Sequence, residues 1–184
     1  LEADPKFALA QALLAHTYFW IAATMEPGPV WIGRAKDALQ RADQMDPGLA
    51  EVHVVRGEIL ASWYDKFDWS GAVRELRLAQ ALNPGVGHKE LGLIYSRMGL
   101  EELALKQLHR GLEIDRASDF YQTAAIVGYG NLGLFEEVIP LYSSLRNRKG
   151  PSWALLAVGR LQDAEPLIQA HIATKHNLVG DRAQ

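Results

Sequence analysis

Apolar residues recur along the chain at helical intervals, and short polar segments interrupt the pattern. Four such segments end with a polar residue followed by proline or a residue in its place, which is typical of a helix exit. They are Leu1–Pro5, Ala42–Pro47, Ala79–Pro84 and Gly111–Arg116. The pattern therefore predicts a chain of helices with regularly placed ends.

Within each predicted unit, a small residue precedes a large apolar residue by four positions. The pairs are Ala35 and Leu39, Ala72 and Leu76, Ala104 and Leu108, and Val138 and Tyr142. Such a pair on one helix face lets a second helix approach closely and fills the space beside it. Upstream segments ending at Tyr18, Leu60, Tyr95 and Tyr129 supply the partner helix. Each unit is therefore predicted to be a helical hairpin.

These residues resemble the tetratricopeptide repeat, in which Trp-x2-Leu-Gly-x2-Tyr, Ala-x3-Phe and Pro recur over 34 residues. The resemblance covers nearly the whole chain in four copies. Successive exits at Pro5, Pro47, Pro84, Arg116 and Gly150 lie 42, 37, 32 and 34 residues apart. The extra residues fall in the turns of the first two hairpins and leave the packed faces intact. The resemblance implies an all-α, right-handed superhelical solenoid of antiparallel helical hairpins.

The repeats predict a single domain over residues 1–184. Its parts are a first repeat at 6–47 with a long internal turn, repeats at 48–84, 85–116 and 117–150, a degenerate capping repeat at 151–174, and a tail at 175–184. We expect the sequence to be part of a longer protein, because its first residues look like the end of an earlier element. Residues 63–84 are similar to repeats attached to bacterial serine/threonine kinases or winged-helix regulators, which implies a signalling or regulatory parent.

Composition narrows the function mainly by exclusion. The chain has 19 Lys and Arg against 22 Asp and Glu, without long like-charge runs, so nothing indicates a nucleic-acid or membrane-surface partner. It contains no cysteine, which excludes disulfides and cysteine-based zinc sites and favours a cytoplasmic location without fixing one. The apolar stretch 8–25 is interrupted by Gln11, His16 and Thr17, so it is predicted to be a buried helix rather than a membrane span.

No motif for catalysis, a cofactor or a metal is present, so the protein is predicted not to be an enzyme. His53 and His88 stand at the consensus tryptophan position and are predicted to be core residues rather than metal ligands. Asp65 and Asp68 lack the further oxygen ligands of a calcium loop. We expect both carboxylates to lie in a solvated turn.

Aromatic residues gather at the two enlarged turns. The second turn holds Trp63, Tyr64, Phe67 and Trp69, and Trp20 and Trp31 flank the first. These rings either form an apolar docking patch or pack between the two turns, and the second arrangement is favoured because aromatic rings at repeat seams are ordinary core.

Four residues depart from the repeat pattern. Arg56 stands where leucine is expected, and it either extends from the seam or pairs with a nearby carboxylate such as Glu58 or Glu90. Three glycines lower the helix propensity of one first helix, and they indicate either close helix approach or a hinge. These are Gly128, Gly130 and Gly133.

The stacked hairpins predict a concave surface, lined by the first helix of each hairpin, that suits an extended peptide or a partner helix. By resemblance, its lining consists of His16, Phe19, Glu51, Val54, Glu58, Ser62, Lys89, Leu93, Ser96, Arg97, Phe120, Thr123, Val127 and Asn131. Lys89 matches the lysine of a carboxylate clamp, but the asparagine positions are not matched. The predicted function is a non-catalytic module that binds a peptide or protein segment. A small-molecule sensor near Lys89, or self-association as a homo-oligomer, is the alternative.

Overall fold

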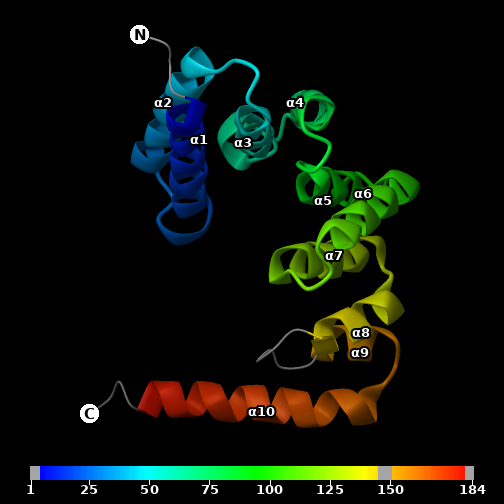
Figure 1. Cartoon of the computed structure of the whole chain (residues 1–184). Helices are drawn as coiled ribbons and strands as arrows, with labels where there is room; N and C mark the ends of the chain where they lie inside the picture. The colour runs from blue at the N-terminus through cyan, green and yellow to red at the C-terminus, as the bar shows by residue number, and fades with distance from the viewer. Residues whose placement is uncertain (1–4, 145–150, 181–184) are drawn as a thin grey trace. The chain divides into compact units, whose positions relative to one another are not determined.

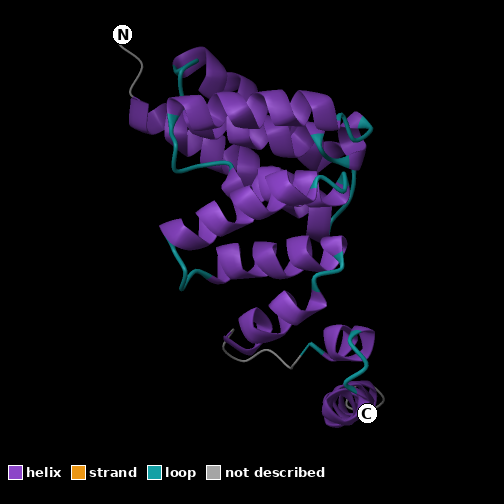
Figure 2. Ribbon diagram, turned by 90° about the vertical axis from the view of Figure 1, so that its right-hand side faces the viewer, coloured by secondary structure: helices purple, strands orange, loops and turns teal. Residues whose placement is uncertain are grey.

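The computed structural model describes residues 5–144 and 151–180, and within these ranges the chain is all-helical (Figure 1). Within these ranges, ten α-helices, one π-helical turn and one 3-10 turn follow one another along the chain, and no strand is drawn in Figure 2. The prediction of an all-α fold is confirmed. The helices group into two compact units, one ending at Ile94 and one beginning at Tyr95. This division falls inside the segment 85–116 that the sequence predicts to be one repeat.

Unit 1 consists of two helical hairpins and the start of a further helix. Its elements are α1 (Pro5–Trp20), η1 (Ile21–Met25), α2 (Pro29–Met45), α3 (Ala50–Leu60), η2 (Trp63–Asp65), α4 (Trp69–Leu82) and the first part of α5 (His88–Arg97). The helix α1 packs along α2, α3 packs along α4, and α1 also contacts α3. The two first helices of this unit therefore lie next to each other.

Local sequence features set the ends of these helices. Pro29 begins α2, where its fixed φ suits a first helical position and its missing N–H costs no hydrogen bond. Asp68 caps α4 because its Oδ1 accepts a hydrogen bond from the Gly71 N–H at 2.9 Å. Lys66 and Phe67 both have a φ of 57°, in the left-handed region. The chain uses these two residues to pass from η2 into α4.

The core of unit 1 contains the small and large residues that the sequence pairs. Ala35, Ala72 and Leu76 are fully buried, and Leu39 is 6% exposed. A Cβ atom at Gly57 on α3 would lie 2.7 Å from Leu76 Cγ, which is closer than real contacts allow. The close packing of α3 on α4 therefore requires glycine at this position.

The helix α1 buries only one of its faces. The buried positions are Ala8, Ala12, Ala15 and Phe19. On the opposite side, Phe7, Leu13 and Trp20 are each 54% exposed. The prediction of a buried helix is thus right for one face and wrong for the other. By length and composition alone, Phe7–Met25 is also the one described helical segment that is apolar enough to cross a membrane.

Unit 2 contains the remaining helices. They are the end of α5, α6 (Glu101–Ile114), α7 (Asp119–Leu132), α8 (Phe135–Ser144), α9 (Ser152–Ala157) and α10 (Leu161–Gly180). α7 packs against α6 and α8, and α9 packs against α8 and α10. α10 continues past the predicted end at Thr174, because neither proline nor glycine occurs between Thr174 and Gly180. The predicted tail is therefore helical up to Gly180, and residues 181–184 lie outside the described ranges.

The glycines of α7 have packing roles in unit 2. A Cβ atom at Gly128 would lie 2.5 Å from Leu108 Cδ1, and one at Gly130 would lie 3.1 Å from Trp153 Cη2. Gly133 follows the last helical residue with a φ of 78° and ends α7 in the left-handed conformation. Close helix approach and helix termination therefore account for the three glycines.

Candidate functional site

Four titratable side chains from three successive first helices meet in unit 1. His16 comes from α1, Glu58 from α3, and Lys89 and Glu90 from α5. Lys89 Nζ lies 3.4 Å from Glu58 Oε1 and 2.9 Å from Glu90 Oε1, and His16 Nε2 lies 3.2 Å from Glu58 Oε2. We call these four residues the first-helix cluster. It brings together three of the residues that the sequence assigns to the binding surface.

The helices place these side chains for local reasons. Glu58 follows Gly57, at which a Cβ atom would clash with Leu76 of α4, so its position is set by the tight packing of that hairpin. Glu90 lies in the first turn of α5, where unpaired N–H groups and the helix dipole favour a carboxylate. Glu90 is not among the predicted lining residues, because it does not fall at a lining position of the repeat, and it was expected only as a candidate partner of Arg56. Its place beside Lys89 in a first helical turn is the signal that identifies it.

The cluster is buried except at one end. The side chains of Glu58, Lys89 and Glu90 are 12%, 17% and 9% exposed, whereas that of His16 is 38% exposed. Glu58 Oε2 is inaccessible to solvent and has no hydrogen-bond partner. The imidazole of His16 is within ion-pair distance of this oxygen, but it does not approach with hydrogen-bond geometry. The histidine therefore separates an unsatisfied carboxylate oxygen from solvent.

Burial and neighbouring charges change the acidity of all four groups. Contact with Glu58 raises the pKa of His16 and outweighs burial, which acts to lower it. Burial acts to raise the pKa of Glu58, but the contact with His16 and the charge of Lys89 lower it overall. Burial raises the pKa of Glu90, and repulsion from Glu58 raises it further. Burial acts to lower the pKa of Lys89, but the two carboxylates raise it. The cluster therefore favours protonated His16 and Lys89.

The other predicted lining residues differ in accessibility. Phe19 is 9% exposed and belongs to the core of unit 1, because it lies one helical turn after buried Ala15. In unit 2, Ser96 is 3% exposed and its Oγ accepts a hydrogen bond from Asn131 Nδ2 at 3.0 Å. Neither Phe19 nor Ser96 is therefore open to a ligand. The half-buried lining residues are Glu51, Val54, Ser62, Leu93 and Thr123. The exposed lining residues are Arg97, Phe120, Val127 and Asn131.

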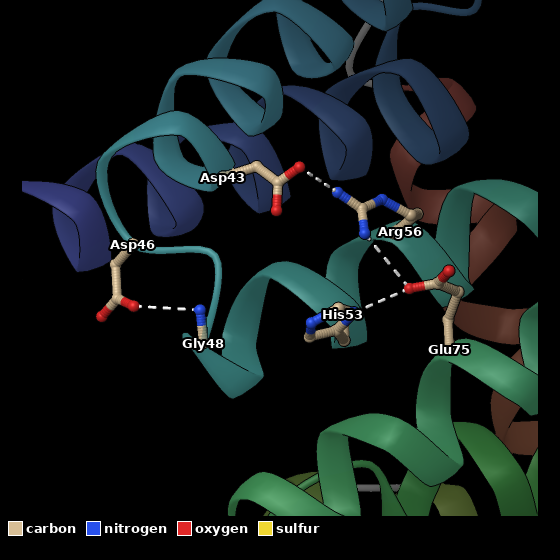
Figure 3. A network of polar contacts seen from close by, with 6 residues as sticks. All are labelled: Asp43, Asp46, Gly48, His53, Arg56 and Glu75. Carbon is tan, nitrogen blue, oxygen red and sulfur yellow. Dashed lines mark hydrogen bonds and ion pairs between the residues drawn. The ribbon is translucent and has the colours of Figure 1, made fainter.

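Arg56 lies in a separate polar network of unit 1 (Figure 3). Its guanidinium is 2.9 Å from Asp43 Oδ2 and 3.3 Å from Glu75 Oε2, and His53 Nδ1 is 2.8 Å from the same Glu75 oxygen. The prediction that Arg56 pairs with a nearby carboxylate is confirmed, but the carboxylates are those of Asp43 and Glu75 rather than those of Glu58 or Glu90. Because residues two apart on a helix point about 200° apart, Arg56 and Glu58 face different neighbours.

The core histidines have structural partners. His53 is 7% exposed and contacts Glu75, as described above. His88 is also 7% exposed, and its two ring nitrogens lie 2.9 Å from Gln80 Nε2 and from the carbonyl oxygen of Pro84. Both rings therefore have polar partners within unit 1. Within the described residues, no group of three or more His, Asp or Glu side chains is arranged to hold a metal ion.

The enlarged turns of unit 1 contact each other through Tyr64. Its hydroxyl donates to the Ala22 carbonyl at 2.9 Å and accepts from the Gly28 N–H at 3.1 Å. The expected packing of the two turns is therefore present. However, Trp63 and Phe67 are each 54% exposed, so only part of the aromatic group is buried.

Each unit also contains an open cavity. The cavity in unit 1 has a volume of about 300 Å³ and includes the ion pair between Lys36 and Asp65, at 2.7 Å. The cavity in unit 2 has a volume of about 580 Å³ and lies between α6, α7 and α8. Its lining consists of His109, Leu112, Glu113, Arg116, Tyr129, Glu137, Pro140 and Leu141. Burial and the nearby charge of Glu137 raise the pKa of Tyr129.

Comparison with known proteins does not assign the chain to a family. No protein-family model matches it, and a search of curated proteins finds no relative.

Proposed function

We propose that the protein is a non-catalytic interaction module that binds a peptide or protein segment on the surface of its first helices. The first-helix cluster carries this proposal. Side chains of α1, α3 and α5 meet in it, which supports a surface formed by successive first helices. A surface built from repeated helices presents regularly spaced groups that suit an extended ligand.

The proposal includes a repeat array of the tetratricopeptide kind that belongs to a larger bacterial signalling or regulatory protein. The sequence pattern supports the array, because the predicted small and large residues of the hairpins are buried, except for Tyr142, which is half-buried. In unit 2, Ala104 and Val138 are fully buried and Leu108 is 3% exposed. The resemblance of residues 63–84 to arrays on kinases and regulators supports the context.

The exposed part of the proposed surface in unit 2 includes an apolar stripe on α7. Phe120 and Val127 lie two helical turns apart and are 49% and 41% exposed. Such a stripe offers contacts for apolar side chains of a bound segment. On α4, Leu78 and Leu82 form a pair of similar exposure, at 46% and 45%, outside the first helices. Substitution of the α4 pair is therefore a matched control for substitution of the α7 pair.

The experiment is capture from the source organism's lysate, followed by calorimetry with the purified partner. The baits are the wild type, Phe120→Ala/Val127→Ala and the control Leu78→Ala/Leu82→Ala. We expect the α7 variant to bind the partner about tenfold more weakly or worse, and the α4 variant to bind it like the wild type. Equal binding by the wild type and the α7 variant would contradict the proposed surface in unit 2. Reversal of the Lys89 charge is unsuitable as a test, because it would place three carboxylates together.

The cavity of unit 2 favours a second candidate function, the sensing of a small molecule. Its volume of about 580 Å³ lies in the range of ligand sites, and it combines apolar walls with Arg116 and Tyr129. A metabolite that raises the melting temperature of the wild type but not of Arg116→Ala would support this function. No stabilisation by any compound of a metabolite collection would count against it.

A further inference from the structure

The first-helix cluster contains one more buried carboxylate than permanent cation. Glu58 and Glu90 share Lys89, which is the one lysine or arginine in the cluster. A buried charge without a partner is strongly unfavourable, so with both carboxylates ionised the cluster is balanced only when a second positive charge is present. In the structure, His16 is placed to supply that charge when its ring is protonated.

The second positive charge is needed at one particular atom, Glu58 Oε2. Lys89 contacts Oε1 of both carboxylates, whereas Glu58 Oε2 has no hydrogen-bond donor. The only cluster side chain that is more than one-fifth exposed is His16, and it lies over this oxygen at 3.2 Å. A rotation of the His16 ring would therefore open Glu58 Oε2 to a group that arrives from solvent.

We propose that the first-helix cluster is a binding site for an alkylammonium or guanidinium group, which takes the place of the His16 ring at Glu58 Oε2. This inference rests on the proposed function, in which a lysine or arginine of the bound segment supplies the group. The incoming cation donates hydrogen bonds to Oε2, and protonated His16 releases its proton to solvent. The cluster then keeps two carboxylates and two cations, as it does with protonated His16.

The carboxylate is suited to such a ligand. It is already removed from water in the free protein, so the ligand meets an acceptor that needs little further desolvation. Hydrogen bonds to a buried ionised acceptor are among the strongest in proteins. Lys89 repels a second cation, but Glu58 and Glu90 attract it.

Exchange of a proton for the ligand makes the affinity depend on pH. The groups that act on His16 are Glu58 from α3 and Lys89 and Glu90 from α5. From α2, Arg41 is hydrogen-bonded to Gln11 on α1 at 3.2 Å, and η1 contains no titratable residue. Below its raised pKa, His16 competes with the ligand. Affinity should therefore increase as the pH rises through that pKa and level off above it.

The experiment uses n-butylammonium and n-butylguanidinium as probes of lysine and arginine chemistry, with n-butanol as the neutral control. Binding to the full chain is followed by NMR of the histidine ring nitrogens at constant ionic strength, with the His16 signal assigned by His16→Gln. We expect saturable binding of one or both cations in the millimolar range, deprotonation of His16 on binding, and no saturation with n-butanol.

Two charge-matched variants test the site. Glu58→Gln should weaken cation binding about tenfold or more, while Asp37→Asn, which removes an exposed charge on α2, should leave it within twofold. His16→Gln should keep binding, followed through backbone amide signals, but lose its pH dependence. This variant tests the proposal even if Glu58→Gln does not fold.

The outcomes separate this inference from the proposed function. If neither cation saturates, or if the cations bind equally to the wild type and Glu58→Gln, the cation site is overturned. The proposed function then still stands if the partner from the lysate binds and the α7 variant weakens it. If the cations bind as expected but no partner binds, the site is upheld as a site for free amines and the peptide-binding function fails.

Discussion

Replacement of Gly57 by alanine tests whether α3 and α4 pack as tightly as the structure shows. The new Cβ atom would lie 2.7 Å from Leu76 Cγ and 3.1 Å from Leu76 Cδ2. Ordinary van der Waals contact begins at 3.4 Å, and Leu76 is fully buried, so it has no free space into which it can move. The substitution should therefore overpack the interface of the hairpin.

Two opposing effects set the magnitude. Alanine gains about 1 kcal/mol over glycine in a helix interior, whereas overpacking of a dense core costs about 1–3 kcal/mol. We expect Gly57→Ala to lower the free energy of unfolding by about 0–2 kcal/mol. Leu76→Ala alone should cost about 2–5 kcal/mol, because it leaves a cavity. In the Leu76→Ala background the clash with Leu76 is absent and only the 3.3 Å contact with the Ala72 carbonyl oxygen remains, so Gly57→Ala should be neutral or stabilise by up to about 1 kcal/mol.

The assay is urea unfolding of the wild type, both single variants and the double variant, followed by circular dichroism. Gly33→Ala in α2 is the matched control, because nothing lies within 4 Å of the added Cβ atom and the helix gain remains. It should stabilise by about 1 kcal/mol. The reasoning is refuted if Gly57→Ala stabilises as much as Gly33→Ala. It is also refuted if the effects of Gly57→Ala and Leu76→Ala simply add.

Three further predictions concern the stability of unit 1. Asp68→Ala removes the N-cap of α4 and should lower the free energy of unfolding, measured by urea unfolding, by about 1 kcal/mol. Asp68→Asn keeps an oxygen that can accept the capping hydrogen bond and should retain most of the stability of the wild type. Tyr64→Phe removes both hydrogen bonds between the enlarged turns and should cost about 1–3 kcal/mol in the same assay, and an unchanged midpoint would contradict their role. Because the pKa of His16 is raised in the folded protein, protonated His16 stabilises the fold at a pH below 6.5, the ordinary pKa of histidine. This stabilisation is lost as the pH rises through the raised pKa. In urea unfolding between pH 5 and 9, the free energy of unfolding of the wild type should therefore decline as the pH rises, and His16→Gln should decline less. A parallel decline in both proteins would refute the assignment to His16.

The helical hairpins were predictable because their signals are local. Pro47 and Pro84 follow the ends of α2 and α4 as the sequence predicts, since proline cannot continue a helix. The small and large residues at four-residue spacing identify the buried face of α2, α4 and α6. These features depend on one helix and its immediate partner, so the sequence contains the information.

The composition of the candidate site was only partly predictable. His16, Glu58 and Lys89 follow from the repeat pattern, but Glu90 does not, because the direction of its side chain depends on where α5 begins. The partners of Arg56 were also missed, because the pairing with Asp43 and Glu75 depends on how α2 and α4 lie beside α3. Contacts between helices require three-dimensional positions that the period of one helix does not determine.

The enclosure of Lys89 has a consequence for its chemical reactivity. Amine-directed reagents attack the unprotonated amine, and this side chain is 17% exposed with a pKa raised by the two carboxylates. During mild acylation of the folded protein, Lys89 should therefore be modified more slowly than exposed Lys36 or Lys106. Its rate of labelling, measured by mass spectrometry of the digested protein, reports directly whether the three first helices are assembled around it.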